Sequence, residues 1–382
     1  MSGHAPAESL GPDRRRQLLA PLAAVNARLT ATRGHAAPLQ PAHTCYVPAD
    51  RLRADEARLW GDEALALLDE HAPDNVALAG ILGLDLPELT YDDVVRILRD
   101  RPVADLRVDL EDGYGSRSDQ AEDEEVARCV ALLAEGPPPS YGVRVKSLEG
   151  HTAERSLRTL DLWLTALHEA GLRPGVVTLP KVSAPEQVSV AVEALTQIEA
   201  ALGSHGTALE LQVETAEGVV DSAGRITVSL LVAAGRGRVT GLHFGTYDFT
   251  AALAVSPQDQ RIDAPIADAA KDLLQLAAAG TGVAVSDGSS NLLPIGDGVH
   301  HAWRTHARLV DRALTRGLWQ GWDLHPGQLV SRWAATSAFL RARLPEVDAR
   351  RTSSRPHISE EPATRAMLEA LAQRASSLGI ES

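Results

Sequence analysis

The fold is decided by LELQVE, residues 209–214, and VTGLHFGTYD, residues 239–248. Both are short, largely apolar runs of residues that favour strands, and each ends on a carboxylate, Glu214 in the first run and Asp248 in the second. A helix-length segment separates the two runs. This alternation predicts consecutive βα units of a parallel sheet.

Six further runs of the same kind occur along the chain. They are HTCYVPA (43–49), ADLRVDLED (104–112), YGVRVKSL (141–148), VVTLPKV (176–182), TGVAVSDG (281–288) and WQGWDLHP (319–326). The intervening segments include amphipathic stretches at residues 153–171 and 184–203, with apolar residues near helical spacing and a glycine at the end. Eight such units predict an α/β fold, a closed (β/α)8 TIM barrel.

We expect the barrel domain to span residues 41–344. Residues 1–40, rich in Ala, Arg and Pro, would form an N-terminal extension. Residues 345–382 would form a C-terminal tail that ends in a helix and acts as a lid or as an arm onto a neighbouring subunit. The first crossover, residues 50–103, is unusually long, and we expect one or two helices within it.

The composition narrows the class of protein. The formal net charge is −14 and the only basic run is Arg14–Arg16, which argues against a nucleic-acid-binding surface. No stretch approaches the roughly eighteen apolar residues of a membrane span, and the N-terminus lacks the apolar segment of a secretory signal. We therefore expect a cytoplasmic protein with no membrane partner. Cys45 and Cys129 are isolated, so neither a disulfide nor a thiolate zinc site is expected.

Ionisable residues stand at or near the carboxyl end of seven of the eight runs. They are Asp109, Glu111, Asp112, Arg144, Lys146, Lys181, Glu214, Asp248, Asp287 and His325. In a (β/α)8 barrel these ends converge on the face that carries the active site. Charges that simply mark the starts of loops would explain about half of them. That alternative explains less well why both acidic and basic residues occur within the otherwise apolar ends of the strands.

Glu214 and Asp248 are the candidate metal ligands. Adjacent strands would bring both carboxylates to one side of the barrel mouth, and two carboxylates with waters and substrate oxygens suit Mg²⁺ or Mn²⁺. Two solvated loop carboxylates are an equally good interpretation of the spacing. The run VDLEDG, residues 108–113, adds three acids, which are costly together unless a cation lies nearby.

Three further side chains have two interpretations each. Arg144 could bind a carboxylate or an enolate oxygen, or could be a structural partner of Asp109 or Glu111. Lys181 could clamp an anionic substrate or form a Schiff base, and the Schiff base is less favoured because a metal stabilises the same carbanion. His325 could contact substrate as a general acid or base, although a histidine in this position is more often a structural hydrogen-bond partner.

The ordered series VDLEDG, RVKS, LPKV, VETAEG, FGTYDF, SDG and DLHPGQL resembles the citrate lyase β-subunit-like family, which includes malyl-CoA and citramalyl-CoA lyases. That family belongs to the phosphoenolpyruvate/pyruvate superfamily of TIM barrels. The resemblance runs from about residue 43 to 330 and marks the chain as a divergent member.

The resemblance implies a Mg²⁺-dependent lyase whose metal is held by Glu214 and Asp248. Arg144 corresponds to an arginine that binds the substrate carbonyl or carboxylate. Backbone amides near Gly245 and Thr246 would receive a keto-acid carboxylate. The implied reaction is cleavage or formation of a carbon–carbon bond next to a carbonyl, with glyoxylate or pyruvate as the keto acid and an acyl-CoA as a candidate co-substrate.

The resemblance also implies roles for further residues around the substrate, and at two positions this sequence differs from the acyl-CoA lyases of the family. Glu111 and Asp112 would orient metal-bound water. Lys146 replaces an asparagine usual in the acyl-CoA lyases, which changes the charge beside the substrate. Glu360, in ISEEP, stands where those lyases carry an aspartate that transfers a proton in a neighbouring subunit's site, so a trimer or hexamer is implied.

Two other functions fit a barrel of this kind. One is a metabolite-binding barrel without turnover, which would not need a metal that polarises carbonyls. The other is a phosphoenolpyruvate-dependent transferase, which would need a phosphate-carrying histidine or a nucleotide-binding module, and the sequence contains no P-loop. A metal-dependent carbon–carbon lyase or aldolase remains the leading hypothesis.

Overall fold

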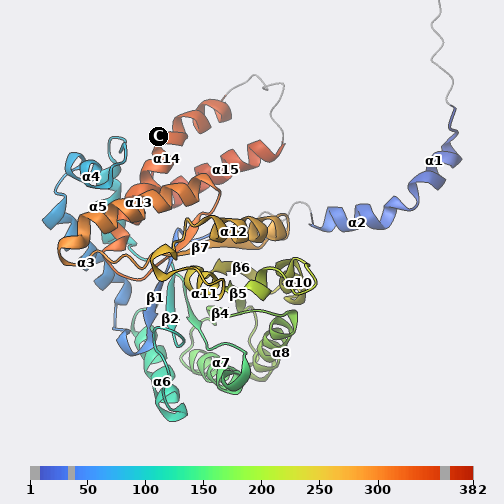
Figure 1. Cartoon of the computed structure of the whole chain (residues 1–382), viewed down its shortest axis with the longest axis horizontal. Coiled ribbons are helices and arrows are strands. Elements are labelled where there is room, and N and C mark those ends of the chain that lie inside the picture. The colour runs from blue at the N-terminus through green and yellow to red at the C-terminus, as the bar shows by residue number, and fades with distance from the viewer. Residues whose placement is uncertain (1–8, 33–38, 353–361, 382) are drawn as a thin grey trace, which may run out of the picture.

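The computed structural model describes residues 9–32, 39–352 and 362–381. Eight parallel strands form a closed barrel, in which each strand pairs with the next and β8 pairs with β1 (Figure 1). The strands are β1 (His43–Pro48), β2 (Leu106–Asp109), β3 (Tyr141–Arg144), β4 (Val176–Leu179), β5 (Ala208–Val213), β6 (Val239–Phe244), β7 (Ala284–Ser289) and β8 (Gln320–Asp323). The predicted (β/α)8 barrel is confirmed.

Helices form the outer layer and connect the strands (Figure 1). Those that follow β2 to β8 are α6 (Asp119–Glu135), α7 (Ala153–Glu169), α8 (Pro185–Leu202), α10 (Thr227–Ala234), α12 (Pro265–Ala278), α13 (Val299–Thr315) and α14 (Gln328–Thr352). Two short helices, α9 (Ala216–Val219) and α11 (Thr246–Ala252), directly follow β5 and β6. The first crossover contains three helices rather than one or two: α3 (Glu56–His71), α4 (Asn75–Leu82) and α5 (Thr90–Asp100).

All strands except β5 are shorter than the runs that predicted them. The run at residues 239–248 forms a strand only as far as Phe244. Gly245 then precedes the first turn of α11, so Asp248 lies on that helix rather than on the strand. The polar ends of the runs therefore belong to loops and helix starts at the barrel mouth.

Alternation along the strands separates two environments. Apolar side chains face the helices and form the main core, among them Leu106, Val108, Val143, Val177, Leu209 and Leu211. The inside of the barrel is polar. Arg107 lies 2.6 Å from Asp105 and 3.0 Å from Glu210, whereas His243 lies 3.0 Å from Glu210 and accepts a hydrogen bond of 2.8 Å from the Trp322 indole. Burial opposes ionisation of Glu210, but the Arg107 charge and His243 hold its pKa at about 2.

The ends of the chain add helices outside the eight units. Helices α1 (Pro12–Leu19) and α2 (Leu22–Thr32) precede the barrel, and α1 buries no side chain. Helix α14 runs through residue 344, where we expected the barrel domain to end. Helix α15 (Pro362–Ser377) packs on α14, and Leu340 and Leu344 of α14 form an apolar cluster with residues of the C-terminal segment. None of the helices in the described ranges is both long and apolar enough to span a membrane.

Candidate active site at the carboxyl ends of the strands

A cavity of about 420 Å³ opens at the carboxyl ends of the strands. Its wall includes six of the residues predicted from the sequence: Asp112, Arg144, Glu214, Gly245, Thr246 and Asp248. They come from the ends of β2, β3, β5 and β6, which is the face where barrel enzymes carry their active sites.

Glu214 directly follows β5 and is buried, with 4% of its surface exposed. One carboxylate oxygen accepts a hydrogen bond of 2.9 Å from the backbone N–H of Lys181, and the other accepts one from the Gln212 amide. Gly245 lies against this carboxylate, because a Cβ atom there would come within 2.4 Å of Glu214 Oε2. Burial raises the pKa of Glu214 to about 7, so its negative charge is poorly compensated by the protein alone.

The Lys181 ammonium lies among four carboxylates. Its Nζ atom is 2.6 Å from Glu111, 3.2 Å from Asp112, 3.1 Å from Asp248 and 4.0 Å from Glu214. The two predicted metal ligands therefore face the same cation. Burial lowers the pKa of Lys181, but the charges of Glu214 and Glu111 outweigh it and raise this pKa above its usual range. One ammonium faces four acids, so the cluster retains a negative excess that favours a further cation.

The backbone of Lys181 is itself unusual. Its φ angle is +52°, in the left-handed region that non-glycine residues rarely adopt, and such conformations cost about 1–3 kcal/mol. Its N–H is fixed by Glu214, and its side chain reaches the acids of the β2 loop. Lys181 thus contacts both groups of predicted acids: Glu214 and Asp248, after β5 and on α11, and Glu111 and Asp112, after β2.

Arg144 is held by Asp109 at the end of the neighbouring strand. Its Nε and Nη2 atoms donate hydrogen bonds of 2.7 and 2.6 Å to the two carboxylate oxygens. The remaining Nη1 atom donates to Gln212 at 3.2 Å and lies 3.6 Å from Glu111. The guanidinium also stacks on the Tyr46 ring, 4.9 Å from its centroid. Arg144 is therefore a structural partner of Asp109 that still directs one nitrogen toward the cavity.

Lys146 does not face the cavity. Its ammonium donates hydrogen bonds to the carbonyl oxygens of Leu110 and Gly115, at 2.9 and 3.1 Å, and lies 3.3 Å from Glu122. On a continued strand, Lys146 would point inward like Arg144, toward the substrate. Strand β3 ends at Arg144, so this alternation of side chains does not reach Lys146. Its contacts fix the loop that carries Glu111.

Two other predicted residues, His325 and Asp287, lie outside the cavity wall. His325 is half-buried and outside the cavity wall, and its Nδ1 accepts a hydrogen bond of 3.0 Å from the backbone of Gly327. Asp287 faces outward from β7 and pairs at 2.9 Å with Lys271 of α12. Glu360 falls outside the described residues, so its predicted role in proton transfer stays a prediction.

The cavity wall also contains residues that the sequence reasoning missed. Among them are Tyr46, Gln212, Tyr247, Asn291 and Trp322. Gln212 could have been found, because it stands two residues before Glu214 and so faces the same side of the strand. The buried hydroxyl of Thr246, a predicted residue, has no hydrogen-bond partner within the described ranges.

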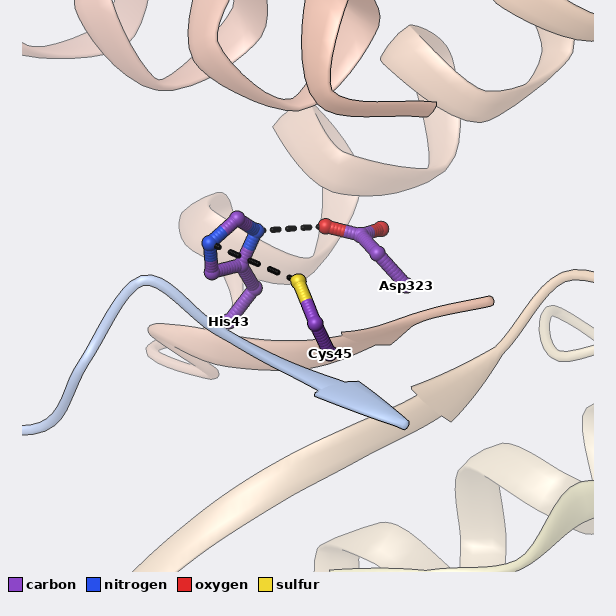
Figure 2. A group of neighbouring side chains, drawn as sticks. All are labelled: His43, Cys45 and Asp323. Carbon is purple, nitrogen blue, oxygen red and sulfur yellow. Dashed lines mark hydrogen bonds and ion pairs between the residues drawn. The ribbon is translucent and has the colours of Figure 1, made fainter. Parts of the chain in front are cut away.

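A second group with metal-ligand residue types is His43, Cys45 and Asp323, on the outer side of β1 and β8 (Figure 2). The ring Nε2 of His43 accepts a hydrogen bond of 2.9 Å from the Ala104 backbone, so Nδ1 carries the proton that is donated to Asp323 at 2.6 Å. Both oxygens of Asp323 also accept hydrogen bonds from Arg332, at 3.0 and 2.9 Å. With these donor atoms already engaged and a guanidinium adjacent, the group joins the barrel to α14 rather than holding a metal.

Comparison with known proteins gives a family model and several similar barrels. The family model, described as a domain of unknown function (DUF6986), matches residues 22–376. None of the curated proteins that were compared matches the chain.

Among solved structures, a citrate lyase from Burkholderia xenovorans LB400 has a TM-score of 0.56 and 18% identity, covering 91% of this chain and 94% of that one. Native malate synthase from Haloferax volcanii at 3 mM glyoxylate has a TM-score of 0.52 and 18% identity, covering 91% and 88%. Its magnesium/glyoxylate complex has a TM-score of 0.50 and 17% identity, covering 77% and 75%. At such identities the likeness shows the shared fold.

Proposed function

Because this chain belongs to the DUF6986 family, a domain family of unknown function, we propose its activity from the residues of the site. It is a lyase or aldolase that depends on a divalent metal and breaks or forms a carbon–carbon bond next to a carbonyl. The observation that carries this proposal is the convergence of Glu214 and Asp248, from consecutive βα units, within 4.0 Å of the Lys181 ammonium.

The residues of the site fit a hard cation. The donors are carboxylate oxygens, the ligand type that Mg²⁺ and Mn²⁺ prefer. Glu214 has its pKa raised to about 7 by burial, which is expected of a carboxylate that needs a counter-cation. When bound, Mg²⁺ or Mn²⁺ would polarise the carbonyl oxygen of the substrate. Glu214 and Asp248 would hold it, and Glu111 and Asp112 would orient its waters.

The protein's own groups would bind and orient the keto acid. Asp109 fixes the Arg144 guanidinium, so that Nη1 would stabilise the oxygen on the carbon released as the keto acid, which carries negative charge once its proton has been removed. Backbone amides near Gly245 and Thr246, which both line the cavity, would receive the carboxylate of the keto acid. A donor fixed before the reaction needs no reorganisation during it, which is why the rigid Arg144 is suited to this task.

In the cleavage direction, the electron pair of the broken bond goes to the fragment that leaves as an enolate, and the hydroxyl carbon becomes a carbonyl. With a hydroxyacyl-CoA this carbonyl is that of the keto acid, whereas with a 4-hydroxy-2-keto acid it is that of an aldehyde and the enolate is that of pyruvate. A base must take the hydroxyl proton and an acid must protonate the enolate. Glu360 remains our candidate for this proton transfer. The proposed keto acid is glyoxylate or pyruvate, and the Haloferax barrel of similar fold was solved with magnesium and glyoxylate together.

The test is to incubate the purified protein with Mg²⁺, Mn²⁺ or EDTA and a panel of 4-hydroxy-2-keto acids and 3-hydroxyacyl-CoA thioesters. Released glyoxylate or pyruvate is measured by derivatisation and chromatography. We expect turnover with either metal, loss of turnover with EDTA, and a loss of at least about 100-fold in Glu214→Gln.

The matched control is Glu217→Gln, because Glu217 is exposed on the short helix that follows Glu214. This variant should keep wild-type turnover. Turnover that survives both EDTA and Glu214→Gln would contradict the proposal. Binding of keto acid without any turnover across the panel would favour a metabolite-binding barrel instead.

A further inference from the structure

A second cavity, of about 230 Å³, lies at the opposite end of the barrel from Glu214. Its wall includes Ala42, Ala104, Pro139 and Trp319, which come shortly before β1, β2, β3 and β8. The cavity is therefore at the amino ends of the strands, whereas barrel enzymes carry their chemistry at the carboxyl ends. It is separate from the proposed active site.

The cavity has an aromatic and aliphatic wall. Trp319 and Trp333 line it together with Val103 and Leu340. The Trp333 indole donates a hydrogen bond of 2.9 Å to the carbonyl oxygen of Pro102, which fixes that ring. The wall thus offers rigid apolar surface to the body of a small molecule.

The only cations in this wall are two arginines, and neither has a carboxylate partner within the described ranges. Arg374 of α15 lies over the Trp319 ring, 4.4 Å from its centroid, and donates a single hydrogen bond of 3.2 Å to the backbone oxygen of Gln40. Burial alone lowers the pKa of Arg374 to about 10, which is consistent with the lack of an acid nearby. Arg101 lines the same cavity with its side chain exposed.

We propose that this cavity binds a small organic anion, a monocarboxylate with an apolar body, whose carboxylate pairs with Arg374 and whose body lies against Trp319 and Trp333. A planar guanidinium with free N–H donors is the group that pairs best with a carboxylate. The volume is below the roughly 300–1,000 Å³ of sites for drug-sized ligands, so the ligand is a small acid rather than a nucleotide or a CoA thioester.

Such a ligand would join two parts of the chain. Arg374, Ser377 and Leu378 belong to the C-terminal segment, whereas the rest of the wall belongs to the barrel and α14. Bound acid would form an ion pair with Arg374 of α15 and apolar contacts with Trp319 and Trp333, and so would hold α15 against the barrel. The local opening of α15 should therefore become rarer when the cavity is filled.

The experiment uses the full chain with benzoate and phenylacetate as probes and benzyl alcohol as the neutral analogue. Isothermal titration gives the affinities, and hydrogen exchange locates the bound probe. We expect at least tenfold tighter binding of the acids than of the alcohol, with slower exchange at residues 371–381. Equal affinity for acid and alcohol, no binding of either, or protection confined to peptides that contain Arg144 and Glu214 would overturn the proposal.

Variants separate this site from the active site. Arg374→Gln should lower the affinity for benzoate at least tenfold and leave that for benzyl alcohol unchanged. Arg365→Gln, on the exposed face of the same helix, is the matched control and should bind benzoate like the wild type. Glu214→Gln should also bind benzoate normally, because the proposal does not rest on the proposed lyase activity.

Discussion

Arg144 and Asp109 stand directly opposite each other at the ends of β3 and β2, joined by two parallel hydrogen bonds of 2.7 and 2.6 Å. The pair is buried, so neither charge can be removed without leaving the other uncompensated. Its geometry also determines where the third nitrogen of the guanidinium, Nη1, points. The positioning of substrate therefore depends on a contact that is itself part of the fold.

Arg144→Lys tests this dependence. A lysine keeps the charge but cannot form the two parallel hydrogen bonds, so we expect kcat to fall at least about 100-fold while Mn²⁺ affinity changes less than about threefold. Steady-state kinetics and titration with Mn²⁺ measure the two effects. Arg158→Lys, at an exposed arginine of α7, is the control. Near-normal turnover in Arg144→Lys would show that the two parallel hydrogen bonds between Arg144 and Asp109 are not needed to orient the substrate.

Lys181→Met should bind a divalent metal more tightly. The wild-type ammonium lies within 4.0 Å of four carboxylates and repels a second cation, so its removal should strengthen Mn²⁺ binding about tenfold. Electron paramagnetic resonance of free Mn²⁺ gives the affinity. Lys181→Arg keeps the charge and should remain close to wild type. Weaker Mn²⁺ binding in the methionine variant would mean that Lys181 organises the ligands instead.

Gly245→Ala should disturb Glu214 directly. The new Cβ atom would lie 2.4 Å from Glu214 Oε2 and 2.5 Å from its Cβ, so the carboxylate must move. We expect Mn²⁺ affinity to fall about tenfold and stability to fall by about 1–3 kcal/mol. Gly80→Ala is the control, because its Cβ meets nothing within 4 Å in the middle of α4. A crystal structure of Gly245→Ala with an unmoved Glu214 would refute this account.

Lys146→Met should loosen the loop after β2. The ammonium contacts Leu110, Gly115 and Glu122, and a methionine keeps the length of the side chain without these contacts. We expect faster hydrogen exchange at residues 110–118 and a roughly tenfold lower kcat. Unchanged hydrogen exchange at residues 110–118 would show that the Lys146 ammonium does not hold this loop in position.

Glu199 should contribute to stability in a pH-dependent way. Burial opposes its ionisation, but hydrogen bonds from Arg238 and from the Thr207 backbone hold its pKa at about 2, against about 4.5 ordinarily. Because the folded-state pKa is the lower one, this stabilisation is fully present above about pH 4.5 and is lost as the pH falls toward 2. Glu199→Gln should lose about 2 kcal/mol at pH 7, with a shrinking difference from the wild type below pH 4.5. Urea unfolding measures this, with the exposed Glu193→Gln as the control.

The fold followed from the sequence because each βα unit is marked locally. The apolar runs and the glycine-terminated helical stretches occur in sequence order, and a barrel pairs each strand with the next one along the chain. The number of helices in the first crossover was underestimated. Residues 75–84 form one apolar patch in the sequence, which gave no sign that a separate helix, α4, begins there after its own N-cap, Asp74.

The site was harder to predict, because a charge at a strand end does not reveal the direction of its side chain. Glu214 and Arg144 continue the inward alternation, whereas Asp287 faces outward next to an irregular register between β7 and β8. Lys146 lies beyond the end of its strand, where alternation no longer applies. The central place of Lys181 depends on a left-handed backbone that no sequence pattern signals.

The docking of α15 has a practical consequence for anyone who produces this protein. Leu340 and Leu344 are covered by the C-terminal segment, and the last described backbone oxygens accept hydrogen bonds from Arg96 and Arg341. A chain cut after residue 361 would expose this apolar surface and should precipitate during expression. An affinity tag is therefore better placed at the N-terminus, where α1 buries no side chain.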